Sequence, residues 1–365
     1  MTTTKNNEHK KLNVPNLRFK EFEGEWEMCK FKDVCSTSTG NKNTQDKIDD
    51  GIYPFYVRSQ TVERINSWTF DGEAILTAGD GVGVGKVFHH TYGKIGVHQR
   101  VYILSNFKCD ANYLFHFFSS NFYNRVKRMS AKNSVDSVRK EMITEMPLYL
   151  PSEQEQTKIG VLLSLLDERI ATQNKIIDKL QSLIRGIRNE VFGKLRKTVG
   201  FNAILGDVLS YEQPQSYIVE NTEYTNEGIP VLTANKAFVL GYTSETDGIY
   251  DKGDCIIFDD FTLDCKYVDF PFKVKSSAIK ILTARNKELL RYTFEFLKYL
   301  DLSTDEHKRH YIAETQNQSF ILPNARMIEI IAHTFSALSL QMQYAVKQRN
   351  KHEEEKQYLL RQMFI

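Results

Sequence analysis

The chain has 365 residues, with 48 lysines and arginines against 46 aspartates and glutamates and a formal net charge of +2. This length allows two or three domains with a core each, and a hydrophobic content of 41% with 12% aromatic residues excludes a disordered protein. The near-neutral charge excludes a polycationic tail. It does not exclude nucleic-acid binding, because acidic residues elsewhere can balance a basic face.

The sequence also bears on location and metal binding. The first residues, MTTTKNNEHKK, lack the apolar core of a signal peptide, and no apolar run approaches the length of a membrane span. The five cysteines form no Cys-x-x-Cys pair, which favours reduced thiols. His307 and His310 have His-x-x-His spacing, but no cysteine pair flanks them, so we predict no metal site. We expect a soluble cytoplasmic protein without membrane contacts.

Residues 77–87, TAGDGVGVGKV, form the most glycine-dense stretch and invite comparison with phosphate-binding loops. A P-loop needs Ser or Thr after its lysine, but Val87 follows Lys86, and Asp80 stands where the first glycine belongs. The dinucleotide pattern G-x-G-x-x-G fails as well, because Val84 occupies its last glycine position. Since β-prone segments flank the stretch, we predict a turn between two strands.

Both halves of the chain alternate β-prone runs with a helix. The predicted strands are GIYPFYV, EAILTA and RVYIL in the first half, and GDCIIF and AIKIL in the second. A helical segment follows in each half, NYLFHFFSSNFYNRVKRM at residues 112–129 and KELLRYTFEFLKYL at residues 287–300. A polar loop then leads to a Leu-Pro pair in each half.

The chain contains one unit twice. The offset of 172 residues that relates the two Leu-Pro pairs, at residues 150–151 and 322–323, also relates Phe192 to Phe364. Other similar pairs are FKDV (31–34) with LGDV (205–208), GIYPFYV with GIPV, and FDGEAIL with YDKGDCII. Their offsets drift by a few residues, as loops of different length require. We therefore predict two mixed globular domains, each followed by a long helix.

The first long helix is predicted to begin at a capping box, in which Ser152 and Glu155 each bind a free amide of the first turn. Beyond it, ten positions alternate in steps of three and four over 33 residues, and nine of them are apolar. This period favours a coiled coil or helical spacer, with a core helix as the alternative. The positions are Ile159, Leu163, Leu166, Ile170, Gln173, Ile177, Leu180, Ile184, Ile187 and Val191.

The second long helix is less regular. Phe335, Leu338 and Met342 continue the same period, and then the run KQRNKHEEEK at residues 347–356 interrupts it. We interpret this run as solvated, with a face for another subunit as the alternative. Residues 193–200, GKLRKTVG, are predicted to end the first helix and form a short linker.

The sequence lacks the parts of a DNA-modifying enzyme. It has no Pro-Pro pair for the loop of an amino-methyltransferase, no glycine-rich loop for S-adenosylmethionine and no P-loop. Asp259 and Asp260 follow a predicted strand, but no Glu-x-Lys completes a nuclease site. We interpret Asp305, Glu306 and Lys308 as solvated charges.

Binding residues are more plentiful. The loops SAKNSVDSVRKEM (130–142) and HKRHYIAETQNQS (307–319) carry side chains that bind phosphates or base edges, although an ordinary exposed loop has a similar composition. The candidate DNA-binding residues are Arg58, Gln60, Lys86, Arg100, Lys132, Asn133, Ser134, Arg139, Asn235, Lys236, Lys266, Arg309, Gln316 and Asn317.

Three segments carry a resemblance to a known family. VPNLRFKEFEGEWEMCKFKDV, GIYPFYV and LPSEQEQTKIGVLLSLLDERI resemble the specificity subunits of type I restriction–modification systems, and the resemblance includes the duplication. It implies an α+β fold with two target recognition domains separated by two long antiparallel coiled-coil helices. The implied boundaries are 1–151 for an N-terminal arm and the first recognition domain, 152–196 for the central helix, 197–323 for the second recognition domain and 324–365 for the C-terminal helix.

The resemblance implies a non-catalytic subunit that reads a split, asymmetric site in double-stranded DNA. The helices would dock two methyltransferase subunits, and restriction/translocase subunits would join through this methyltransferase core. Adenine methylation and restriction would belong to these partners, as would S-adenosylmethionine, ATP and Mg, so that no cofactor is expected in this subunit. A coiled-coil DNA-binding or scaffold protein outside restriction–modification is the alternative.

The resemblance also suggests a place for the glycine-rich stretch. Residues 79–86 would belong to the β-structure of the first recognition domain, with Lys86 as a phosphate contact. The second half keeps a Gly-Asp pair at Gly253 and Asp254 but lacks the other glycines, so a shared role for the loop is not implied.

Overall fold

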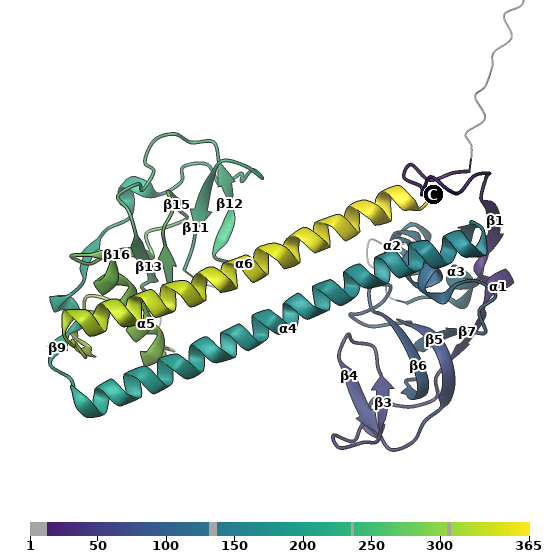
Figure 1. The fold of residues 1–365 in the computed structure, drawn as a ribbon, viewed down its shortest axis with the longest axis horizontal. Coiled ribbons are helices and arrows are strands. Elements are labelled where there is room, and N and C mark those ends of the chain that lie inside the picture. The colour runs from purple at the N-terminus through teal and green to yellow at the C-terminus, as the bar shows by residue number, and fades with distance from the viewer. Residues whose placement is uncertain (1–12, 131–136, 235–236, 305–307) are drawn as a thin grey trace, which may run out of the picture. The chain divides into compact units, whose positions relative to one another are not determined.

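The computed structural model describes residues 13–130, 137–234, 237–304 and 308–365, and the chain divides into two compact units (Figure 1). The first unit contains Met1–Gln173 and Gln348–Ile365, and the second contains Asn174–Lys347. Two long helices, α4 (Glu153–Thr198) and α6 (Ala325–Met363), contribute to both. The predicted fold class is confirmed. None of the described helices combines the length and apolar composition that crossing a bilayer requires.

The sheet of the first unit has the strand order β2–β7–β5–β6–β3–β4. Its neighbours are antiparallel, apart from β3 and β6, which run parallel. The side chains of β5 alternate: Ile75 packs with helix α2 (Ala111–Met129), and Ala74 and Leu76 join a separate cluster. The strands are β2 (Ser36–Thr39), β3 (Tyr53–Tyr56), β4 (Val62–Ile65), β5 (Phe70–Ala78), β6 (Phe88–Val97) and β7 (Val101–Ser105).

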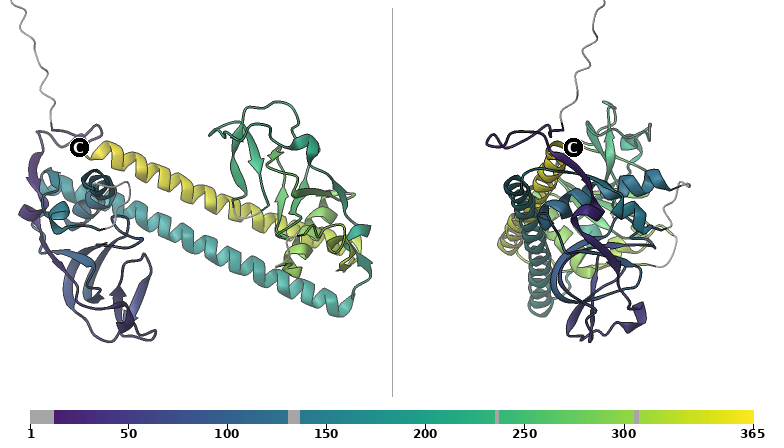
Figure 2. Two further views of the ribbon diagram at one scale, coloured as in Figure 1. Left: turned by 180° about the vertical axis from the view of Figure 1, so that it is seen from behind. Right: turned by 90° about the vertical axis from the view of Figure 1, so that its right-hand side faces the viewer.

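Smaller elements complete the first unit. An arm, residues 13–26, lies beside the C-terminal end of α6 (Figure 2), where Leu17 N–H donates to the Gln362 carbonyl at 2.9 Å. The short elements are β1 (Glu27–Lys30), which pairs with β8 (Pro147–Leu150), the helices α1 (Phe31–Val34) and α3 (Lys140–Thr144), and the 3-10 turn η1 (Thr44–Asp46).

The second unit has a four-stranded sheet, β10–β16–β13–β14, and a three-stranded sheet, β12–β11–β15. Their strands are β10 (Ser210–Glu212), β11 (Ile229–Leu232), β12 (Val239–Thr243), β13 (Cys255–Asp259), β14 (Cys265–Val268), β15 (Lys273–Val274) and β16 (Ile279–Thr283). The other elements are helix α5 (Lys287–Leu300), the pair β9 (Ala203–Ile204) and β17 (Ser319–Phe320), and the turns η2 (Leu205–Asp207), η3 (Gln215–Tyr217) and η4 (Thr315–Asn317).

The two units share one strand topology. β13 pairs with β14 and β16 as β5 pairs with β6 and β7, and β11 runs parallel to β15 as β3 runs parallel to β6. β14 and β15 together therefore take the place of the single strand β6. The duplication found in the sequence is a duplication of architecture.

Equivalent side chains make equivalent contacts in the two units. The Tyr113 hydroxyl donates to the Tyr149 carbonyl at 2.6 Å, and the Tyr292 hydroxyl donates to the Ile321 carbonyl at 2.7 Å. The carboxylates of Asp33 in FKDV and Asp207 in LGDV each accept from the backbone N–H three residues earlier, at 2.9 and 3.0 Å.

The C-terminal end of each long helix enters a hydrophobic core. The Phe192 ring of α4 packs against Tyr292 with ring centroids 5.4 Å apart, in the core of the second unit. Phe364, just beyond α6, packs against Tyr113 at 5.3 Å, in the core of the first unit. The pair Phe192 and Phe364 found in the sequence thus marks one structural position in both units.

The predicted capping box forms only in part. The Ser152 hydroxyl accepts from Glu155 N–H at 3.4 Å, as expected. The Glu155 carboxylate, which is fully buried, instead accepts hydrogen bonds from Nε and Nη2 of Arg18, both at 2.8 Å. The arm therefore takes the acceptor that the box reserves for the Ser152 backbone.

Helices α4 and α6 pair antiparallel. In the first unit Lys356 of α6 forms an ion pair with Asp167 of α4, and in the second the Arg188 guanidinium lies 5.8 Å from the centroid of the Phe335 ring. Advancing 21 residues along α4, from Asp167 to Arg188, corresponds to going back 21 residues along α6, from Lys356 to Phe335. All ten predicted seam positions of α4 are buried or half-buried.

Two helix predictions need correction. The run at residues 347–356 does not interrupt the second helix, because α6 continues unbroken to Met363. Its inward positions are polar and pair locally, as Lys356 does with Asp167. Most of the predicted linker at residues 193–200 is helical too, since α4 ends only at Thr198 and Gly200 closes it with a φ of 74°.

Two glycines of α4 have opposite surroundings and provide a test of the packing. A Cβ on Gly160 would lie 2.9 Å from atoms of Asp110, Asn112 and Tyr113, whereas a Cβ on Gly186 meets nothing within 4 Å. We expect Gly160→Ala to destabilise the chain by about 1–3 kcal/mol through overpacking. The control Gly186→Ala is expected to stabilise it by about 0.5–1 kcal/mol. Urea unfolding measures both, and a Gly160→Ala midpoint at or above wild type would contradict the packing.

A buried histidine lies between α2 and α4. The side chain of His116 is 1% exposed, with Nε2 3.2 Å from the Ser164 hydroxyl and Nδ1 3.8 Å from Asp167. Burial, aided by the nearby Lys356 and His90, lowers the pKa of His116 to about 3. The ring is therefore neutral in the folded chain at neutral pH.

This histidine makes stability depend on pH. Unfolding returns its pKa to about 6.5, so the unfolded chain binds the extra proton below that pH and the free energy of unfolding falls. We expect a loss of about 1.4 kcal/mol per pH unit between about pH 6.5 and 3. His116→Gln should flatten this dependence in urea unfolding at pH 7.5, 6.5 and 5.5, whereas His333→Gln, on an exposed face of α6, should not. Equal slopes for His116→Gln and wild type would contradict the assignment.

Candidate nucleic-acid interface

The glycine-rich loop joins β5 to β6, as predicted, and its glycines allow close backbone packing. Gly79 N–H donates to the Arg100 carbonyl at 2.7 Å, and a Cβ on Gly79 would lie 2.9 Å from that oxygen. A Cβ on Gly83 would lie 2.3 Å from the Arg58 carbonyl oxygen. Gly81 and Gly85 adopt positive φ angles of 77° and 65°. The loop is therefore pressed against the backbone of two predicted DNA-binding residues.

Asp80, in this loop, joins those two arginines. Its Oδ1 lies 3.1 Å from Nη1 of Arg58, and its Oδ2 lies 3.6 Å from Nε of Arg100. Arg58 follows β3 and Arg100 lies in the turn between β6 and β7, so three separate connections meet at one carboxylate. A cavity of about 330 Å³ opens here, lined by Thr39, Gly79, Asp80, Gln99, Arg100, Tyr102, Ser137 and Val138.

Two histidines hold the backbone around the arginines. Nδ1 of His98 accepts from Arg100 N–H at 3.0 Å, and its Nε2 lies 3.3 Å from the Thr44 hydroxyl. Burial, helped by the nearby Arg58, lowers the pKa of His98, which favours the neutral ring with the proton on Nε2. Nε2 of His89 lies 3.2 Å from the Ser59 carbonyl, next to Arg58.

The other candidates in the first unit lie around this cluster. Val138 N–H donates to the Gly79 carbonyl at 2.7 Å, which joins the glycine loop to the segment before α3. Lys86 is exposed, with Nζ 4.8 Å from the centroid of the Tyr123 ring. Gln60 and Arg139 are also exposed. Lys132, Asn133 and Ser134 lie outside the described residues, as do Asn235 and Lys236 of the second unit.

The equivalent turn of the second unit is built differently. The His310 N–H donates to the Asp260 carbonyl at 3.0 Å, as Val138 does to Gly79, so Asp260 takes the place of Gly79. Gly253 and Asp254 precede β13, whereas the Gly79–Asp80 pair follows β5, so the two Gly-Asp pairs are not equivalent. The comparison drawn from the sequence was wrong on this point.

The acidic pair after β13 supports the turn. Asp259 accepts from the N–H groups of Phe261 and Thr262, at 2.9 and 3.0 Å. Asp260 is 1% exposed, and its carboxylate accepts from the N–H groups of His310 and Tyr311, at 3.0 and 2.7 Å. These carboxylates are committed to the local backbone. Among the described residues, no group of three or more His, Cys, Asp or Glu side chains is placed to hold a metal ion.

The remaining candidates of the second unit do not form one cluster. The Arg309 guanidinium lies 5.8 Å from the centroid of the Phe261 ring at this turn. The Gln316 and Asn317 amides donate to the carbonyls of Ile312 and Ala313, which stabilise their own loop.

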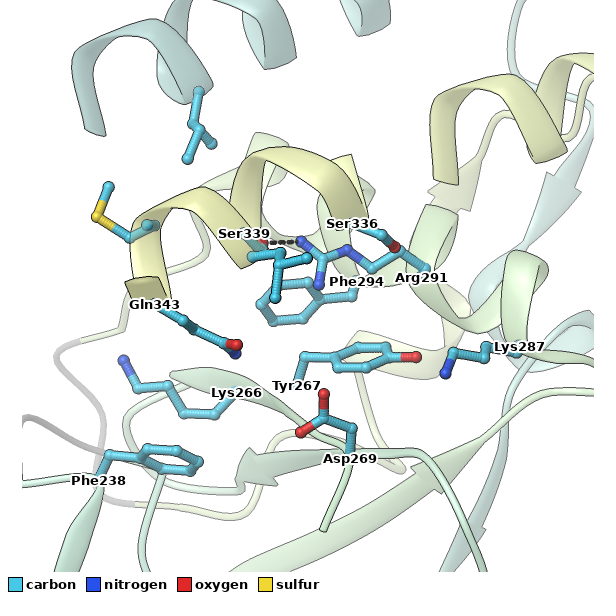
Figure 3. Close-up of a pocket in the computed structure, with 13 residues that line it drawn as sticks. Phe238, Lys266, Tyr267, Asp269, Lys287, Arg291, Phe294, Ser336, Ser339 and Gln343 are labelled. Carbon is cyan, nitrogen blue, oxygen red and sulfur yellow. Dashed lines mark hydrogen bonds between the residues drawn. The ribbon is translucent and has the colours of Figure 1, made fainter. Parts of the chain in front are cut away.

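Lys266 lies elsewhere, in a cavity of about 410 Å³ between β14, α5 and α6 (Figure 3). Arg291 lies in the same cavity, 5.0 Å from the centroid of the Tyr267 ring and 5.4 Å from that of Phe294. Its guanidinium also donates to the Glu295 carboxylate, which Arg188 binds as well. Lys266 therefore shares its surroundings with the helix pair and not with Arg309.

Sequence reasoning overlooked Asp80 and Phe261 as parts of these surfaces. Asp80 was noticed only because it breaks the P-loop pattern, although a carboxylate inside a glycine turn is itself a signal. Phe261 follows two aspartates, and no sequence signal marked it as a ring beside a cation.

Comparisons with known proteins agree with this architecture. Residues 23–182 match the family model described as the type I restriction modification DNA specificity domain. That match covers the first unit up to α4 and the first part of α4 itself. This part of the chain is a type I DNA specificity domain. The resemblance found in the sequence is thereby confirmed.

The relatives of this specificity domain are subunits of type I enzymes from Escherichia coli. The chain is 46% identical over 126 residues to the EcoR124I/EcoR124II specificity subunit, across 33% of this chain and 31% of the relative. It is 26% identical over 167 residues to the EcoDI specificity subunit, across 46% and 37%. The aligned segments thus span about a third of the length of these relatives.

The fold of the whole chain is that of a type I S subunit. The crystal structure of the S subunit from M. genitalium superposes with a TM-score of 0.75 at 15% identity, over 96% of this chain and 99% of that one. The specificity domain matched in the first unit therefore has its architectural counterpart in the second.

Proposed function

We propose that the chain is the DNA sequence-recognition subunit of a type I restriction–modification complex. Each globular unit reads one part of a split, asymmetric site in double-stranded DNA. The observation that carries the proposal is one topology used twice with different side chains at the equivalent turn. The first unit presents Arg58, Asp80 and Arg100, and the second presents Phe261 and Arg309. Unlike surfaces on like scaffolds read different words.

The chemistry is assigned to partner subunits. The aspartates that prompted a nuclease interpretation, Asp259 and Asp260, are bound to backbone amides, which supports a non-catalytic role. Two methyltransferase subunits would bring S-adenosylmethionine, and restriction/translocase subunits would bring ATP and Mg. The helices α4 and α6 would dock the methyltransferase subunits, and the complex would work in the cytoplasm.

The assembled complex tests the proposal. Purified alone, the chain should bind duplex DNA weakly, with affinity that falls steeply with salt, and should transfer no methyl groups. With its methyltransferase subunits it should methylate adenines at two half-sites of different sequence. Sequencing of methylated DNA measures the outcome. A palindromic or continuous site would overturn the two-reader model, and methyl transfer by the clean chain would overturn the non-catalytic role.

A matched pair of insertions tests the spacer role. Gln173 and Asn174 of α4 lie opposite Asn350 and Arg349 of α6 in the antiparallel register. Seven residues inserted after Gln173 and seven after Arg349 keep the pairing and lengthen both helices by about 10 Å. We expect the same half-sites with a gap about three base pairs longer.

An insertion in α4 alone provides the control. It slips the register of α4 against α6, so activity should fall. An unchanged gap in the sites methylated by the paired variant would show that the helices do not set the spacing.

A further inference from the structure

We infer that Arg100 reads a guanine in the half-site of the first unit, with Asp80 as its positioning residue. The inference rests on the proposed function and names a base at one position of the site. It is argued from the fixed backbone of Arg100, the placement of the Asp80 carboxylate, the charge of the cluster and the different turn of the second unit.

The backbone of Arg100 is held on both sides while its side chain stays free. Its N–H donates to the buried His98, and its carbonyl accepts from Gly79 N–H at 2.7 Å. The side chain is 66% exposed. A reader built this way loses little backbone freedom on binding, which leaves more of the contact energy for discrimination.

Asp80 engages one edge of Arg100. The carboxylate faces Nε at 3.6 Å, and of the residues that the structure describes it is the one ionic partner of this guanidinium. The two terminal amino groups remain available. They form the fork that matches O6 and N7 of guanine in the major groove.

The same carboxylate disfavours a phosphate at this place. A phosphate bound by Arg100 would lie near Asp80, and the two negative charges repel each other. A guanine edge presents neutral acceptors, and the paired cytosine presents an amino group that a carboxylate accepts. The cluster therefore favours a G·C pair over the DNA backbone.

The charges of the cluster give a distinctive signature. Arg58 and Arg100 share one carboxylate, which leaves one net positive charge. Removal of the Asp80 charge strengthens attraction to any DNA but frees Arg100 to adopt other directions. Affinity for unrelated DNA and discrimination should thus change in opposite directions, whereas simple damage to the fold lowers both.

The second unit serves as an internal control. At the equivalent turn it presents Phe261 with Arg309, and Asp260 is buried under that turn. The effects of variants at Arg100 and Asp80 should be confined to one half-site, because the second has no such cluster at this turn.

The experiment uses the complex of the full chain with its methyltransferase subunits and a library of duplexes randomised over the site. Base preference is measured at each position by sequencing the bound fraction, and affinity for one unrelated duplex is measured by anisotropy at two salt concentrations. The variants are Arg100→Lys, which keeps the charge but loses the fork, and Asp80→Asn. The control Asp71→Asn removes the same charge from an exposed position on β5. Thermal melts check that each variant is folded.

Wild type should require guanine at one position of one half-site. Arg100→Lys should lower that preference by roughly 5- to 100-fold and leave the other half-site unchanged. Asp80→Asn should lower it as well and bind the unrelated duplex more tightly, and Asp71→Asn should keep the wild-type preference. If Arg100→Lys retains the full preference, Arg100 contacts phosphate or nothing and the inference is overturned alone. A folded wild-type complex without sequence preference would overturn the proposed function, and this inference with it.

Discussion

The architecture depends on each long helix ending in the core of a different unit from the one in which it begins. Helix α4 starts with Ile159 and Leu163 in the core of the first unit and delivers Phe192 to the core of the second. Helix α6 starts with Ile331 in the second core, and Phe364 reaches the first. Burial of each phenylalanine is worth about 1.5–3 kcal/mol. The larger consequence is connectivity, because the first core stays incomplete until the last residues of the chain join it.

Polar clusters accompany this apolar anchoring where the helix pair meets each unit. The first unit has Asp167 with Lys356 and His116, and the second has Glu295 between Arg188 and Arg291. Buried charges rarely add stability over apolar residues, but a charge left without its partner is strongly destabilising. Because the two clusters differ, a helix end in the wrong unit would meet unmatched charges. We regard them as the features that keep two similar halves from exchanging partners.

The glycine-rich loop shows how one composition serves unrelated purposes. In a phosphate-binding loop, glycines let backbone amides surround an anion. Here the missing side chains let the loop approach the carbonyl oxygens of Arg58 and Arg100, within distances that a Cβ would not tolerate. The acidic residue that would repel a phosphate thereby reaches two guanidinium groups. Close backbone approach, and not anion binding, is the common physical reason for glycine in both kinds of loop.

The sequence by itself determined the duplication, the α+β class and the helix seam. Repeated motifs and a period of three and four residues are local signals that survive in any arrangement of the units. Its errors were of one kind. The capping box was assigned without Arg18, which reaches Glu155 from 137 residues away, and Gly253 was matched to Gly79 by identity and not by its place relative to a strand.

Only the tertiary structure decided which polar residues act together. Arg58, Asp80 and Arg100 are about 20 residues apart along the chain, and each taken alone is an ordinary charged residue of a loop. Strand pairing brings β3 beside β6 and β5 between β6 and β7, so that the connections carrying the three residues meet. Their joint chemistry depends on distances of a few ångströms. Those distances follow from the pairing of whole strands, which no local pattern of residues contains.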